Sequence, residues 1–205
     1  MDLVKRKHEG FTLIELMVAM GILSSLTLII YTVAFGTIRS ARTIDDKVLL
    51  QQQGRLALSE MVRNLRMADD ASIETAGGNP IGNAAVTSIV FRRPVDTVGN
   101  GMAVDNNGAI EWSNDITYSV FANADITTNN LSLVQMDTNG NVTKNFTNYL
   151  SPIANSGDFY DAPNGGVEFV RINGGIQITM ILQKGKAGSE SVIRVRLDDF
   201  VTPRN

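Results

Sequence analysis

Residues 10–17 read Gly10-Phe11-Thr12-Leu13-Ile14-Glu15-Leu16-Met17, and no further charged side chain follows before Arg39. The 28 residues from 11 to 38 therefore carry a single charge, that of Glu15. The hydrocarbon core of a bilayer is about 30 Å thick and needs roughly 20 apolar residues in a helix. This stretch predicts a helix long enough to span a membrane.

A short polar segment, residues 1–10, precedes the apolar run and holds three basic residues. A secretory signal is normally cut after its apolar region, at small residues. Here the small residue, Gly10, comes before the apolar region. A carboxylate such as Glu15 costs roughly 2.5 to 3.5 kcal/mol at the bilayer centre, so it is usually paired or functional. Alternatively, it lies at headgroup level, where the helix dipole favours it.

The run from Gly10 to Glu15 resembles the processing site of type IV prepilins and of type II secretion pseudopilins. The resemblance implies that a prepilin peptidase cuts after Gly10 and methylates the new amino terminus of Phe11. Glu15 could then pair with the new amino terminus of Phe11, on its own chain or on a neighbour, and the resemblance implies that the pairing with a neighbour sets the register of subunits in a filament. The long helix that follows resembles PilW-like minor pilins and J-type minor pseudopilins more loosely.

The resemblance implies partners and a location as well. The partners are the prepilin peptidase, an inner-membrane assembly platform, major and other minor pilins or pseudopilins, and membrane lipid. The implied location is the inner membrane, in a single pass with a cytoplasmic leader and a periplasmic or exported C-terminal domain. The filament tip is a second location that the resemblance allows. The side chains expected to pack in the membrane and the filament core are Leu13, Ile14, Leu16, Met17, Ile22 and Leu23.

Composition argues against several other classes of function. The chain has 205 residues, a net charge of −3 and no cysteine, so a disulfide framework or a thiolate nucleophile is impossible. His8, the single histidine, lies in the leader, so the cleaved chain lacks imidazole, the commonest general base and metal ligand. No basic stripe with interleaved aromatic residues suggests a nucleic acid partner. We expect no catalytic site, no cofactor and no metal.

Three further features allow a functional and a structural interpretation. The segment starting at Asp137 superficially resembles a calcium loop, but an EF-hand has Gly at its sixth and Glu at its twelfth position. Here these are Val142 and Asn148, so we predict a hairpin. Trp112 and Tyr118 line either a binding surface or the core, and core packing is favoured. The third feature is a set of helix arginines that are either solvated or paired with acids of a neighbouring subunit: Arg55, Arg63 and Arg66 with Asp45, Asp46 or Glu60.

The pattern from residue 39 to 72 predicts an amphipathic helix that continues the first. Its main apolar stripe falls at helical spacing and comprises Leu58, Met61, Val62, Leu65 and Ala68. Gly54 interrupts the pattern, and a glycine costs up to about 1 kcal/mol relative to alanine inside a helix. We expect one helix that is softened near Gly54.

After residue 72 the composition changes to short alternating apolar segments separated by glycine and asparagine, as in strands and turns. Strands are predicted at 86–93, 109–122, 131–137, 142–149, 167–172, 176–184 and 191–201. The last three form an antiparallel meander, whose first turn is Asn173-Gly174-Gly175. The predicted fold class is α+β: a long N-terminal helix, membrane-spanning in its first half, packed against a C-terminal antiparallel sheet as in pilins.

These observations divide the chain into residues 1–10 as a leader, 11–38 as the membrane and filament helix, 39–72 as its amphipathic continuation and 73–205 as the exported sheet domain. They predict a minor pilin or minor pseudopilin that is structural and not an enzyme. The alternative is a membrane-anchored exported domain that binds a ligand or catalyses a reaction and uses the helix only as an anchor.

Overall fold

A computed structural model describes residues 12–99, 101–122, 131–151, 166–185 and 192–204. It has the predicted α+β architecture of one long N-terminal apolar helix and a C-terminal antiparallel sheet. The chain divides into two compact units, Met1–Ile44 and Asp45–Asn205. Each is described by itself below.

The helix, α1, runs without interruption over Leu13–Met67, and a single 3-10 turn, η1, follows at Asp70–Ser72. The sequence pattern predicted a helix as far as residue 72. The α-helix ends earlier because Asp69 has an extended backbone, with φ −69° and ψ 125°. Its carboxylate accepts a hydrogen bond from the amide of Ala71 at 3.3 Å and caps the 3-10 turn instead.

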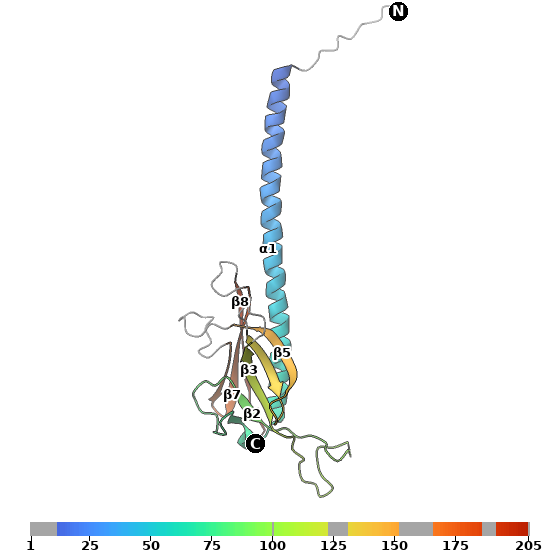
Figure 1. Ribbon diagram of the computed structural model, residues 1–205, viewed down its shortest axis with the longest axis vertical. Helices are drawn as coiled ribbons and strands as arrows, with labels where there is room; N and C mark the ends of the chain where they lie inside the picture. Colours follow the sequence, from blue (N-terminus) through green and yellow to red (C-terminus); the bar gives the residue numbers. More distant parts are fainter. Residues whose placement is uncertain (1–11, 100, 123–130, 152–165, 186–191, 205) are drawn as a thin grey trace, which may run out of the picture. The chain divides into compact units, whose positions relative to one another are not determined.

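In the described residues the sheet contains eight antiparallel strands in the order β1-β2-β3-β4-β5-β7-β6 (Figure 1). β5 and β6 pair with different parts of one edge of β7, and β8 pairs with the opposite edge. Their bounds are β1 Glu74–Thr75, β2 Ile89–Phe91, β3 Ile116–Ala122, β4 Leu131–Met136, β5 Val142–Leu150, β6 Val167–Ile172, β7 Gly175–Lys184 and β8 Ile193–Val201. All seven predicted strands are present. The two-residue strand β1 was not predicted, because two residues are too few to show alternation.

The predicted meander β6-β7-β8 is confirmed by its register. Ile172 pairs with Gly175, and the two residues between them have positive φ, 50° for Asn173 and 77° for Gly174. This is the backbone of a type I′ turn, which asparagine followed by glycine favours. The sequence prediction took the turn as three residues, whereas Gly175 already belongs to β7.

The core of the C-terminal unit lies between the second half of α1 and the sheet. Every residue of the predicted stripe from Leu58 to Ala68 is buried. The stripe belongs to one cluster with residues of β2, β3, β6 and β7 such as Phe91, Phe169 and Ile178. The helix periodicity therefore identified the face that the sheet covers.

Gly54 has a different role from the one that its helix propensity suggests. The helix is continuous through this residue, and Gly54 is buried against β7 and β8. A Cβ placed on Gly54 would lie 2.7 Å from Cδ1 of Leu182 and closer still to Cδ1 of Leu197. The glycine is a site of close approach between helix and sheet, and the helix is continuous here as expected.

We expect Gly54→Val to lower the free energy of unfolding of the C-terminal unit by about 1 to 3 kcal/mol, because the added methyl groups overpack this contact. Gly54→Ala should cost less, because the leucine tips can rotate and alanine gains up to about 1 kcal/mol of helix propensity. Urea unfolding of residues 39–205 measures the difference. The exposed neighbour Gln52 provides the control Gln52→Val, and an equal effect at both positions would contradict the close approach.

One polar network crosses the core. The Asn64 amide donates to the Tyr118 hydroxyl at 2.7 Å, and Arg93 donates to Oδ1 of Asn64 at 2.9 Å. Burial raises the pKa of Tyr118 to about 12. Tyr118 also packs edge-on against Phe91 and Phe146. It is therefore a core residue and not part of a binding surface.

Candidate functional site at the start of the helix

The candidate site contains the predicted cleavage position and Glu15. Gly10 and Phe11 lie outside the described residues, and Thr12 is the first residue that the structure describes. Leu13 begins α1, and the amide of Leu16 donates to the carbonyl of Thr12 at 3.2 Å. Thr12 is therefore the N-cap of the helix.

Thr12 and Glu15 satisfy each other's backbone amides. The amide of Glu15 donates to Oγ1 of Thr12 at 3.3 Å, and the amide of Thr12 donates to Oε2 of Glu15 at 3.0 Å. The Thr12 hydroxyl also donates to the same Oε2 at 3.1 Å. This reciprocal arrangement is a capping box, which pairs two amides that have no partner within the helix.

The capping box was missed in the sequence, although its signal, a threonine followed three residues later by a glutamate before an apolar run, is present. It holds the Glu15 carboxylate beside the first turn of the helix. Both hydrogen bonds to this carboxylate use Oε2, and Oε1 has no partner among the described residues. With respect to the described residues, one oxygen of Glu15 therefore remains available to a cation.

The helix that starts here presents an apolar surface. The side chains predicted to pack in the membrane and the filament core are each more than half exposed, namely Leu13, Ile14, Leu16, Met17, Ile22 and Leu23. The most apolar 18-residue window of α1 has a mean hydropathy of 2.3, and none of it is buried. Length and composition allow α1 to cross a membrane.

The serine and threonine hydroxyls within this apolar surface donate to backbone carbonyls of the same helix. Ser24 donates to the carbonyl of Met20 at 2.7 Å, and Thr27 donates to that of Leu23 at 2.8 Å. Three further hydroxyls, those of Ser25, Thr32 and Thr37, donate in the same way to carbonyls three or four residues earlier. Such bonds allow serine and threonine in a membrane helix, where an unpaired polar group is costly. Glu15 is then the one charged group of this surface.

The other sequence candidates lie in the C-terminal unit, away from this site in the chain. The Asp137 carboxylate accepts hydrogen bonds from the amides of Asn141 and Asn139, at 2.8 and 2.9 Å, and these bonds lower its pKa. The segment is the predicted hairpin turn, with Gly140 at φ 79°. In the described part of the chain, no group of three or more His, Cys, Asp or Glu could hold a metal ion.

The helix acids that were candidates for pairing with a neighbour are largely engaged within the chain. Asp46 pairs with Lys184 at 2.6 Å, and Glu60 pairs with Lys144 at 2.6 Å. These two acids are therefore not free partners for arginines of another subunit. The three helix arginines themselves are exposed, in agreement with the solvated interpretation.

The comparisons with known proteins concern the start of the chain. Residues 5–31 match the family model of the prokaryotic N-terminal methylation motif. No curated protein and no solved structure matches the chain significantly. The motif indicates a precursor of the type IV pilin kind, which a prepilin peptidase processes and which assembles with pilin partners. Together with the apolar helix, it fits a single-pass anchor in the inner membrane.

Proposed function

We propose that this protein is a minor pilin or minor pseudopilin, a structural subunit that primes or joins the assembly of a type IV pilus or a type II secretion pseudopilus. The observation that carries the proposal is the combination at the helix start. A methylation motif covers residues 5–31. It overlaps an exposed apolar surface that begins at Leu13 and has Glu15 as its one charged group. Pilin-like proteins are generally structural, which supports a role without catalysis.

In this proposal each of four segments of the chain has its own role. Residues 1–10 are a leader that is removed between Gly10 and Phe11, and Phe11 becomes the methylated amino terminus. Residues 11–38 lie in the membrane and later in the filament core. Residues 39–72 continue the helix, and residues 73–205 form the exported sheet domain.

The capping box adds a physical reason for the proposed role of Glu15. Because Oε2 is used by Thr12 and Oε1 has no described partner, the carboxylate can accept an ammonium while it still caps the helix. Cleavage before Phe11 would create such an ammonium, on this chain or on an adjacent subunit. In an apolar surrounding this pairing offsets the cost of the carboxylate. We infer that the pairing sets the register of the entering subunit, below another minor subunit in a tip or priming complex.

The alternative function is a membrane-anchored exported domain whose helix is only an anchor. A simple anchor requires neither the carboxylate at Glu15 nor a small residue before the apolar run. The two functions differ in processing and in association. The proposed subunit should co-purify with sheared filaments, whereas an anchored domain should remain with whole membranes.

We expect Glu15→Leu to insert in the membrane but to lower the number of filaments per cell, because the subunit loses the charge that aligns it. Glu15→Asp should have a milder effect, because the charge remains on a shorter side chain. Counting filaments per cell by electron microscopy measures both effects, with protein levels in the membrane as the control.

Glu15→Gln separates the charge from the helix cap, because glutamine also completes a capping box. If charge pairing is the function, Glu15→Gln should lower filament number as much as Glu15→Leu. If cells with Glu15→Gln had as many filaments as wild-type cells, Glu15 would act only as a helix cap. This result would contradict the proposed pairing.

A further inference from the structure

A second surface that the proposed function does not use lies in the C-terminal unit, between β2 and β3. The described residues of 94–112, here called the 94–112 arm, extend away from the sheet as the yellow-green segment of Figure 1. Paired backbone segments stabilise the arm. Pro94 bridges to Trp112, Val104 bridges to Ile110, and the amide of Val95 donates to the carbonyl of Glu111 at 2.9 Å.

Carboxylates fix the backbone of the arm. Asp105 Oδ1 accepts from the amides of Asn107 and Ala109, both at 2.8 Å. Glu111 is buried, and its Oε2 accepts from the amides of Thr97 and Val98. These donors are neutral, so the negative charges remain. Residues 94–112 contain three acids and no lysine, arginine or histidine. The arm is preorganised and negatively charged.

The same arm exposes large apolar side chains. Met102 is 61 % exposed, Val98 is 54 % exposed, and Ile110 and Trp112 are also exposed. A group of exposed apolar residues on one ordered segment is typical of an interaction surface. The negative charge disfavours an anionic lipid surface as the partner. A partner that complements the arm would have an apolar groove with an unpaired basic side chain at its edge.

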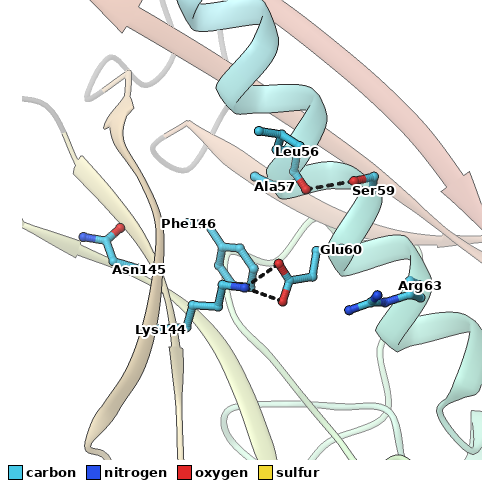
Figure 2. A pocket seen from close by; sticks show the side chains of 8 residues that line it. All are labelled: Leu56, Ala57, Ser59, Glu60, Arg63, Lys144, Asn145 and Phe146. Atoms are coloured by element: carbon cyan, nitrogen blue, oxygen red, sulfur yellow. Dashed lines mark hydrogen bonds and ion pairs between the residues drawn. The ribbon is translucent and has the colours of Figure 1, made fainter.

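A hollow of this kind lies on the same unit, between α1 and β5. This α1–β5 groove has a volume of about 550 Å³ and is lined by Leu56, Ala57, Ser59, Glu60, Arg63, Lys144, Asn145 and Phe146. Leu56 is 71 % exposed, and it also lines an adjacent hollow of about 460 Å³ along β5. Figure 2 shows the Glu60–Lys144 pair across the groove, with Arg63 extending from the helix beside it.

Arg63 leaves the α1–β5 groove with an excess positive charge. Glu60 is neutralised by Lys144, and Arg63 has no ion-pair partner among the described residues. Among the described residues, the edge of β5 that faces β7 pairs only at Leu150. The groove thus combines an apolar floor with an excess positive charge, which matches the apolar character and the negative charge of the arm.

We propose that the 94–112 arm of one copy docks in the α1–β5 groove of a second copy of this chain. The contact is heterologous, since different surfaces meet, and heterologous contacts that do not close produce helical arrays. The inference goes beyond the proposed function, which places another minor subunit above this one but assigns no contact surface to the C-terminal unit.

Disulfide cross-linking tests the contact directly, because the chain contains no cysteine. Two full-length copies with different tags are co-expressed in the native host, one carrying Val98→Cys and the other Leu56→Cys, and the membranes are oxidised. Since a disulfide needs Cα atoms about 4.4 to 6.8 Å apart, we expect a dimer that carries both tags. Both positions are exposed, so neither change disturbs the core.

The matched control replaces the arm position by Ile172→Cys, an exposed apolar residue at the β6–β7 turn. This variant paired with Leu56→Cys should give at least fivefold less dimer. An equal yield from the two pairs would overturn the proposal. Cross-linking of Val98→Cys to a different protein instead of the Leu56→Cys copy would overturn it too.

A charge exchange tests the electrostatic part. Arg63→Glu should lower the yield of the Val98–Leu56 dimer about fivefold, as expected for loss of an ion-pair contact of about 1 kcal/mol. Adding Asn106→Lys on the arm should restore part of the yield, because it gives the new carboxylate at position 63 a cation on the opposite side while the arm keeps its three acids. If Asn106→Lys did not raise the dimer yield of the Arg63→Glu variant, Arg63 would not contact the arm. This result would contradict the proposed pairing.

Discussion

Replacing Leu65 by aspartate is expected to abolish cooperative unfolding of the exported unit. Leu65 is 0 % exposed and lies on the helix face that the sheet covers. Truncating a buried leucine costs about 2 to 5 kcal/mol, and an unpaired buried charge adds to this cost. A domain of this kind is stable by only about 5 to 15 kcal/mol. Circular dichroism and thermal melting of residues 39–205 measure the result.

Leu56 provides the control for this change. It lies on the same helix and has the same side chain, but it is 71 % exposed. Leu56→Asp should therefore change the free energy of unfolding by no more than about 0.5 kcal/mol. Unchanged circular dichroism and melting for Leu65→Asp would mean that the assigned helix face is wrong. If the unsubstituted fragment 39–205 failed to fold, the C-terminal unit would need the first half of the helix.

Replacing Gly10 by valine is expected to block processing completely and to leave the precursor in the membrane. The proposed peptidase cleaves after a small residue, and a branched side chain at that position obstructs the scissile bond. Mass spectrometry of the membrane-extracted protein should give a wild-type chain that begins with methylated Phe11. The Gly10→Val chain should retain residues 1–10.

Gly21 is a matched glycine in the same apolar segment, with open space where a Cβ would be added. Gly21→Val should be cleaved normally, since its position is remote from the cleaved bond in the chain. An intact leader on the wild-type chain in a host with the peptidase would contradict the proposed processing. So would cleavage beyond Ile38.

Local sequence patterns were sufficient to predict the long helix and seven of the eight described strands. The apolar run before Arg39, the strand alternation and the turn at Asn173-Gly174 involve neighbours in the chain, so composition and spacing reveal them. The methylation motif is likewise contiguous. The capping box of Thr12 and Glu15 is also local, because its two residues are three positions apart.

The sequence by itself determined the long helix, the antiparallel strands and the charged group at the start of the apolar surface. Only the tertiary structure decided which distant residues meet. Lys144 is 84 positions from Glu60 and Lys184 is 138 positions from Asp46, so no periodicity links either pair. The same holds for Gly54, which helix propensity marks as a weakness but which allows α1 to approach β7 and β8 closely. Contacts of this kind depend on how the sheet curves around the helix, and that curvature is a property of the packed unit and not of any one segment.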